Sequence, residues 1–212
     1  MNFSELNQRG WTVIDEVYSS EELLELGLSL GTPVPSPNGE LIKEVRRQPK
    51  EKAPVGSQSA KYGLGPFPLH TDTVFWNPPA RYVLLRACGD VRRPTTVISF
   101  EELFDKCPSK VRDLSADSIW HVRAGRTNFY CSMRVPEGGA PGLRYDADLM
   151  SPMNNAAKII GDELRHLVLT EGHAINWTGS TALLINNRIA LHGRGEMPED
   201  EGERVVQRIY VR

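Results

Sequence analysis

The stretch Phe67-Pro-Leu-His70-Thr-Asp72 carries the strongest signal in this 212-residue chain, because it places an imidazole and a carboxylate two residues apart. On a β-strand, residues i and i+2 point to the same face, so His70 and Asp72 can reach one metal ion. A third candidate ligand, His192, lies far downstream. Two imidazoles and one carboxylate leave the other side of an ion open, which is the facial arrangement of non-haem Fe(II) oxygenases. A lone His-x-Asp triplet is weak evidence, so the rest of the chain must support it.

Length and composition predict one compact domain over residues 1–212, because a chain of this size can bury a sizeable core. The formal net charge of -2 gives no strong attraction to nucleic acid or to an anionic membrane. No apolar run is long enough to span a bilayer, and no signal pattern precedes Phe3. The three cysteines lack metal-ligand spacing and read as reduced thiols, so we expect a cytoplasmic protein.

Most of the chain reads as short strands between turn signals. Ser19 and Glu22 form a capping box that opens a helix, which ends before Gly31 and Pro33. Further helices are predicted over 101–114 and 154–169. Strands are predicted over 11–17, 81–88, 95–100, 119–123, 128–135, 175–177, 182–187 and 205–211. This pattern predicts a mainly β (α+β) fold, a sandwich or jelly roll with a few flanking helices.

The segment 31–68 is rich in Pro, Gly, Ser and Lys, and it leads directly to His70. Long irregular segments in compact domains are either functional or disordered, and this position favours a functional one. Basic residues gather in the segment, but acidic residues interrupt them. The pattern therefore indicates a solvated loop, with the basic residues Lys43, Arg46, Arg47, Lys50 and Lys52.

Two arginines, Arg204 and Arg208, follow His192 on the last predicted strand. An iron oxygenase needs electrons to activate O2, and a common source is a 2-oxo acid whose distal carboxylate must be anchored. An arginine suits this role, because its planar guanidinium can bind both oxygens of a carboxylate. Residues four apart on a strand share one face, so Arg204 and Arg208 are expected to point to the same side. The alternative is that both arginines face solvent on an edge strand.

Several motifs together resemble the taurine dioxygenase and clavaminate synthase-like family of Fe(II)- and 2-oxoglutarate-dependent oxygenases. They are Phe67-Pro-Leu-His70-Thr-Asp72 with Pro78-Pro79-Ala-Arg81-Tyr82, Ala182-Leu-Leu-Ile-Asn-Asn187-Arg188 with Leu191-His192-Gly193-Arg194, and Glu203-Arg204-Val-Val-Gln-Arg208-Ile-Tyr-Val211. The segment Gly142-Leu-Arg144-Tyr-Asp146 resembles the clavaminate synthase and asparagine hydroxylase branch. The resemblance runs from about Trp11 to the C-terminus, and it implies a double-stranded β-helix (jelly-roll, cupin-like) core.

The resemblance also implies roles for individual residues. The implied Fe(II) ligands and catalytic residues are His70, Asp72 and His192. The residues implied to bind the distal carboxylate of 2-oxoglutarate are Arg204 and Thr96. The implied substrate contacts are Arg208 for an acidic group, Asp146 for an amino group, and the pocket residues Ser57 and Ser59. Because Asp72 is present, the resemblance implies hydroxylation or desaturation with O2 rather than halogenation.

Together these expectations predict a dioxygenase that hydroxylates an unactivated carbon of a small amino-acid-like substrate, either free or tethered to a carrier, and releases succinate and CO2. One alternative is a non-catalytic jelly roll that binds metal and 2-oxoglutarate as a sensor or scaffold. Another is a cupin-type hydrolase or isomerase, which would not need Arg204. The chain is short for the resembled family, which suits a smaller lid over a larger substrate or a pocket completed by a second subunit of a homo-oligomer. The sequence leaves this choice open.

Overall fold

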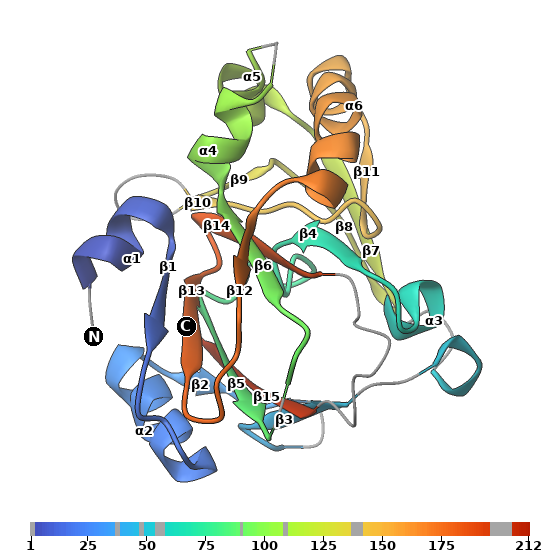
Figure 1. The fold of residues 1–212 in the computed structure, drawn as a ribbon. Coiled ribbons are helices and arrows are strands. Elements are labelled where there is room, and N and C mark those ends of the chain that lie inside the picture. Colours follow the sequence, from blue (N-terminus) through green and yellow to red (C-terminus); the bar gives the residue numbers. More distant parts are fainter. Residues whose placement is uncertain are drawn as a thin grey trace.

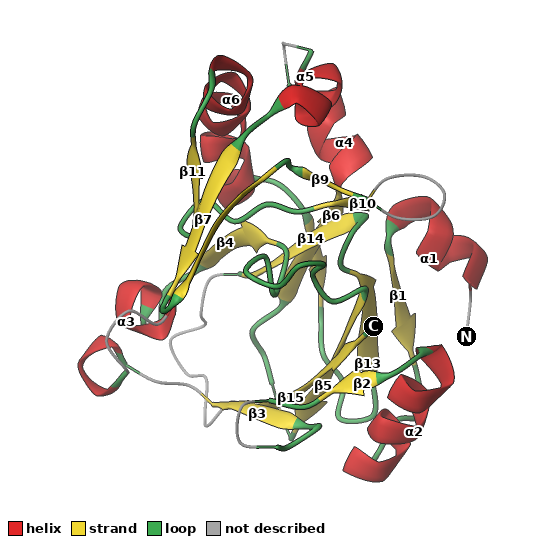
Figure 2. Ribbon diagram, turned by 180° about the vertical axis from the view of Figure 1, so that it is seen from behind, coloured by secondary structure: helices red, strands yellow, loops and turns green. Residues whose placement is uncertain are grey.

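The computed structural model describes residues 3–36, 39–46, 49–53, 58–89, 91–107, 110–136, 142–195 and 205–212. Two antiparallel β-sheets form its centre, and helices lie against their outer sides (Figures 1 and 2). The predicted combination of many strands with a few flanking helices is confirmed. In the described part of the chain, no helix is both long enough and apolar enough to cross a membrane.

The larger sheet has six strands in the order β1-β13-β5-β15-β2, with β3 also paired to β15. These strands are β1 (Trp11–Ile14), β13 (Ala182–Asn186), β5 (Tyr82–Cys88), β15 (Val205–Val211), β2 (Pro33–Val34) and β3 (Lys43–Arg46). All five residues of β13 and the first six of β5 are buried. Strands covered on both faces read as continuous apolar runs, which is why 182–187 and 81–88 were recognisable in the sequence.

The smaller sheet has the order β12-β6-β14-β4. Its strands are β12 (His173–Ile175), β6 (Thr95–Ser99), β14 (Ala190–Arg194) and β4 (Phe67–His70). The register places His192 of β14 opposite His70 on one side and opposite Val97 on the other. Because directly opposed residues in antiparallel strands point to the same face, the two histidine side chains share one face of this sheet.

Apolar side chains from both sheets meet between them, in a cluster formed by Trp11, Val83, Leu85, Val97, Leu183, Ile185, Ala190 and Val206. The outer face of the larger sheet packs on α2 (Ser20–Leu30), with α1 (Phe3–Arg9) beside it. The outer face of the smaller sheet packs on α4 (Phe100–Asp105), α5 (Val111–Asp117) and α6 (Asn155–Thr170). The inner faces of the two sheets are therefore opposed to each other.

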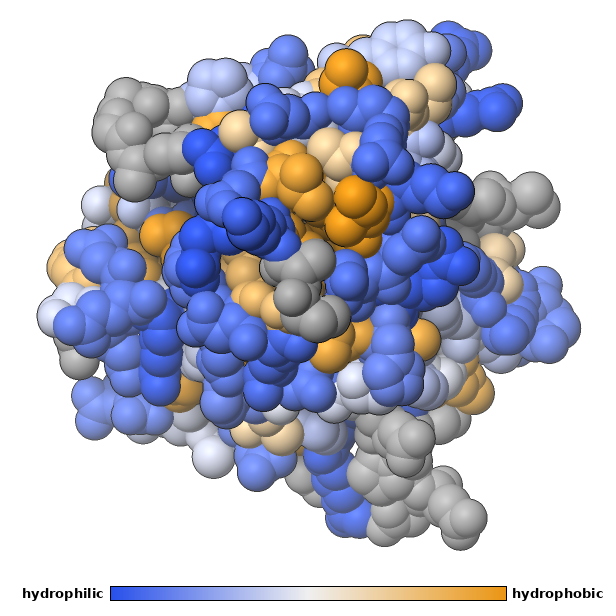
Figure 3. All heavy atoms as spheres, turned by 90° about the horizontal axis from the view of Figure 1, so that it is seen from above, coloured by the Kyte–Doolittle hydropathy of each residue, from blue (hydrophilic) through white to orange (hydrophobic). Residues whose placement is uncertain are grey.

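The remaining elements complete the rim of the molecule. They are a three-stranded sheet in the order β11-β7-β8, the short pair β9 and β10, the 3-10 helix η1 and helix α3. Their bounds are β7 (Trp120–Ala124), β8 (Thr127–Cys131), β9 (Arg134–Val135), β10 (Gly142–Leu143), β11 (Met150–Pro152), η1 (Lys50–Lys52) and α3 (Gln58–Tyr62). Seen from the end that carries α5 and α6, the surface is mainly hydrophilic, with a smaller group of apolar side chains among them (Figure 3).

Two sequence predictions about local structure need correction. The predicted helix over 101–114 is two helices, α4 and α5, and the sequence has Pro108 between them, which disfavours helix at the residue before it. Within the predicted irregular segment 31–68, the residues Lys43–Arg46 form strand β3 rather than a loop, although all four are exposed as expected. Strand β3 forms because β15 offers it an unpaired edge. The predicted capping box of Ser19 and Glu22 is confirmed at the start of α2.

Candidate metal centre

Two imidazoles and one carboxylate meet on the inner face of the smaller sheet. His70 ends β4 and His192 lies in β14, and the centroids of their rings are 4.6 Å apart. The Nε2 atom of His70 is 3.6 Å from Oδ1 of Asp72, and Nε2 of His192 is 3.4 Å from Oδ2. For metal–ligand bonds of about 2.1 Å, neighbouring ligand atoms at right angles are about 3 Å apart. Among the described residues, this buried group can therefore hold a metal ion after small shifts.

Asp72 reaches the site for a different reason from the one that the sequence suggested. Strand β4 ends at His70, so Asp72 lies in the turn that follows rather than at position i+2 of a strand. Its backbone is fixed by Asn187, whose Oδ1 accepts from the Asp72 N–H at 2.8 Å and whose Nδ2 donates to the Asp72 carbonyl at 2.9 Å. Asn187 also donates to the Ala80 carbonyl at 3.0 Å. Asn187 therefore holds both ends of the turn that carries the carboxylate ligand.

Hydrogen bonding also sets the tautomer of one histidine. Nδ1 of His70 lies 3.0 Å from the carbonyl oxygen of Pro68, so Nδ1 carries the proton and Nε2 keeps its lone pair for a ligand. Nδ1 of His192 is buried and has no hydrogen-bond partner among the described residues, while its Nε2 faces Asp72. Both imidazoles thus present Nε2 to the same point.

Electrostatics keep the carboxylate ionised. Burial alone would raise the pKa of Asp72, but the Arg208 guanidinium and the two imidazoles hold that pKa well below its usual range. Burial lowers the pKa of His192 below its ordinary value, which favours the neutral form that binds metals. The pKa of His70 is raised, because the bonds to Asp72 outweigh the effect of burial. A metal ion bound at Nε2 would displace that proton.

The triad opens into a cavity of about 530 Å³ between the two sheets. Arg208 of β15 lines it, and its Nη1 is 3.2 Å from Oδ2 of Asp72. Asp146 and Ser59 line the same cavity. Asp146 is buried, and its Oδ2 accepts a hydrogen bond from Gln58 of α3 at 3.2 Å. The structure therefore brings three of the predicted substrate residues, Arg208, Asp146 and Ser59, to the cavity that contains the triad.

Thr96, the predicted partner of the 2-oxoglutarate carboxylate, does not line this cavity, and its neighbour Thr95 does. The register of β6 explains the difference. Val97 is opposite His192 and lies in the cluster between the sheets, so Thr95 points inward with it and Thr96 points to the outer face. The structure therefore places Thr95, rather than the predicted Thr96, at the cavity. Arg204 and Ser57 lie outside the described residues.

Other cavity residues carried little signal in the sequence. Thr95 could not be separated from Thr96, because two adjacent threonines fit a strand in either phase. Lys43 and Gln58 lie in the segment that the sequence predicts to be irregular. The pairing of β3 with β15 brings Lys43 to the cavity, and helix α3 brings Gln58 there. Asn187 could have been identified from its place shortly before His192, because polar residues near a metal ligand in the sequence can orient that site.

No model of a known protein family matches this sequence, and no curated protein matches it. Solved structures do match its fold. An asparagine oxygenase in complex with Fe(II), 2S,3S-3-hydroxyasparagine and succinate has a TM-score of 0.73 and 16% identity, over 95% of this chain and 74% of that chain. The non-heme iron oxygenase OrfP in complex with Fe, succinate and (3S)-hydroxy-L-Arg has a TM-score of 0.73 and 19% identity, over 99% and 77%.

The PvcB protein from Pseudomonas aeruginosa has a TM-score of 0.70 and 15% identity, over 99% of this chain and 78% of that chain. This chain thus spans about three quarters of the length of each of these three proteins. At these identities the comparison establishes the architecture. The chain shares the fold of structurally characterised non-haem iron oxygenases, and its buried His-Asp-His group lies inside that fold.

Proposed function

We propose that this chain is an Fe(II)- and 2-oxoglutarate-dependent dioxygenase that hydroxylates an unactivated carbon of a small amino-acid-like substrate. The observation that carries the proposal is the convergence of His70, Asp72 and His192 in a buried cavity that also contains Arg208. Two opposed antiparallel sheets support a double-stranded β-helix core, and one catalytic domain would span the chain. The fold of the iron oxygenases named above is consistent with this activity.

The donor set fits Fe(II), because two neutral imidazoles and one carboxylate on one side of an ion leave positions open for further ligands. When bound, Fe(II) with 2-oxoglutarate supplies the oxidation that inserts one atom of O2 into a C–H bond and releases succinate and CO2. His70 and His192 would hold the metal through Nε2, and Asn187 fixes the backbone of Asp72, which would keep its carboxylate directed at the ion.

The surrounding residues position the organic ligands. Arg208 donates to both carboxylate oxygens of Asp72. With that carboxylate bound to a metal ion, the guanidinium would be available to an acidic group of the substrate. Asp146 offers the opposite charge to an ammonium group. Thr95, in place of Thr96, and Arg204 are assigned to the distal carboxylate of 2-oxoglutarate. Leu85 and Val206 line the cavity with apolar surface and exclude water beside these groups.

Succinate release tests the activity. The purified protein is incubated with Fe(II), 2-oxoglutarate and O2 across a panel of L-amino acids, with a no-substrate control. We expect one class of amino acid to stimulate succinate release, and the Asp72→Ala variant to lose it. Asp162→Ala is a matched control, because Asp162 is an exposed carboxylate on α6. Normal turnover by Asp72→Ala would overturn the proposal.

The alternative is a sensor or scaffold that binds metal and 2-oxoglutarate without turnover. An anaerobic sample with Fe(II) and 2-oxoglutarate separates the two, because chelation gives a weak visible charge-transfer band. The band without succinate release for any substrate would favour the sensor. The Arg208→Gln variant adds a second test, since we expect it to weaken amino-acid saturation while the band in the presence of 2-oxoglutarate is retained.

A further inference from the structure

The edge strand β3 places a lysine on the same cavity wall as Arg208. Strand β3 pairs with β15 so that Lys43 is directly opposite Arg208 and Val45 is opposite Val206. Val206 belongs to the cluster between the sheets, so side chains in phase with it point inward. Lys43 and Arg208 are therefore neighbours on one side of this strand pair, and both line the cavity that contains the triad, although Lys43 is also exposed to solvent.

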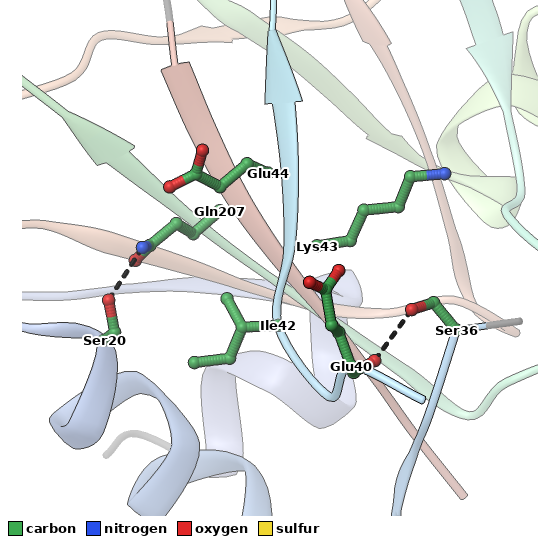
Figure 4. Close-up of a pocket in the computed structure, with 7 residues that line it drawn as sticks. All are labelled: Ser20, Ser36, Glu40, Ile42, Lys43, Glu44 and Gln207. Atoms are coloured by element: carbon green, nitrogen blue, oxygen red, sulfur yellow. Dashed lines mark hydrogen bonds between the residues drawn. The ribbon is translucent and has the colours of Figure 1, made fainter. Parts of the chain in front are cut away.

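A close-up of the outer side of β3 supports this orientation (Figure 4). Glu44 and Gln207 lie on one side of the strand pair, where Gln207 donates to Ser20, and Lys43 extends to the opposite side of β3. Arg208 follows Gln207 in β15, so alternation places it on the side of Lys43. The outer pocket in this view, lined partly by Glu40 and Glu44, is separate from the metal cavity, although Lys43 and Glu44 border both.

The charges on this wall are not balanced once a metal ion binds. Like charges directly opposite one another on neighbouring strands destabilise a sheet. Arg208 pairs with Asp72, whereas Lys43 forms no ion pair within the described part of the chain. With the Asp72 carboxylate bound to a metal ion, Arg208 and Lys43 would both face the cavity, and Asp146 supplies a negative charge there. Of the other charged residues that line it, Arg46 and Glu44 pair with each other, and Arg93 and Arg194 are further cations.

We propose that the substrate is an L-amino acid whose side chain carries a second anionic group, and that Lys43 is a specificity-determining residue. This inference rests on the proposed function. An amino acid with a neutral side chain carries one carboxylate and one ammonium group. The ammonium group can pair with Asp146, but the single carboxylate can pair with only one of Arg208 and Lys43. An amino acid with an anionic side chain supplies an acidic group to each of Arg208 and Lys43 and its ammonium to Asp146.

Calorimetry on the anaerobic protein loaded with Fe(II) and 2-oxoglutarate tests the proposal by binding rather than by turnover. The probes are L-aspartate, L-glutamate and O-phospho-L-serine, each compared with L-asparagine or L-glutamine. We expect at least one acidic amino acid to bind roughly tenfold tighter than its neutral counterpart, as for a gained charge-assisted hydrogen bond. The three probes also distinguish a carboxylate from a phosphoryl group.

Variants assign the preference to Lys43. We expect Lys43→Gln to abolish the preference for the acidic probe while L-asparagine binding is unchanged, and Lys43→Glu to favour the neutral probe. Lys158→Gln, which removes an exposed charge on α6, should leave the preference intact. Equal binding of acidic and neutral probes, or a preference that survives Lys43→Gln, would overturn the proposal. Absence of the charge-transfer band would instead refute the proposed function itself, and the inference with it.

Discussion

Replacing Asn187 by alanine should weaken both the fold and the metal centre. Asn187 is fully buried and makes three hydrogen bonds, two to the backbone of Asp72 and one to that of Ala80, at 2.8–3.0 Å. The Asn187→Ala variant leaves one N–H and two carbonyl groups without these partners in the interior. At about 1–1.5 kcal/mol for each of the three bonds, we expect the free energy of unfolding to fall by about 3–4.5 kcal/mol. That is a large part of the ~5–15 kcal/mol typical of a domain.

The same change should loosen the carboxylate ligand. Groups that orient metal ligands typically contribute about 10–100-fold to metal affinity, so we expect Fe(II) to bind Asn187→Ala weaker by that factor. Urea unfolding of the metal-free protein measures the stability, and anaerobic Fe(II) titration below the unfolding transition measures the affinity. Asn155→Ala is a matched control, because Asn155 is exposed in the first turn of α6 and should change stability by less than about 0.5 kcal/mol.

The outcome of these two measurements can refute the reasoning. If Asn187→Ala unfolds at the same urea concentration as the parent and binds Fe(II) equally well, the turn that carries Asp72 is held by other contacts. A loss of stability with unchanged Fe(II) affinity would show that Asn187 supports the fold but does not orient the ligand.

Three further changes have defined outcomes. In Gly193→Ala, the new Cβ would lie 2.6 Å from the backbone oxygen of Phe67, so the substitution should push β14 away from β4 and reduce Fe(II) affinity in the same titration. Gly179→Ala should leave the affinity unchanged, because no described atom lies within 4 Å of a Cβ at that position. Asn154→Ala removes the N-cap of α6 and should lower the free energy of unfolding by about 1–2 kcal/mol in urea, and an unchanged midpoint would contradict this. Burial, and secondly the nearby charge of Asp146, raises the pKa of the Tyr145 hydroxyl far above 10.0 in the folded protein. The hydroxyl therefore loses its proton more readily in the unfolded chain, and the free energy of unfolding should fall as pH rises above about 10. Tyr145→Phe should remove that part of the alkaline loss in unfolding curves recorded from pH 8 to 11, and an identical pH dependence would refute it.

Predictions from the sequence were reliable where the structure depends on interactions between residues close together in the chain. The capping box of Ser19 and Glu22 was readable because its hydrogen bonds join residues three apart. The buried strands β5 and β13 were readable as apolar runs. The metal ligands were also predicted to come together, although Asp72 lies in a turn fixed by Asn187, a residue more than a hundred positions away.

The sequence by itself therefore determined which residue types can form the site and that His70, Asp72 and His192 are candidates to share it. Strand pairing decided the rest. A shift of one residue moves every side chain of a strand to the other face, and the phase of β6 put Thr95 rather than Thr96 in the cavity. Lys43 lies beside Arg208 only because β3 pairs with the free edge of β15. Such pairing depends on contacts between segments far apart in the chain, and no local pattern in the sequence specifies its register.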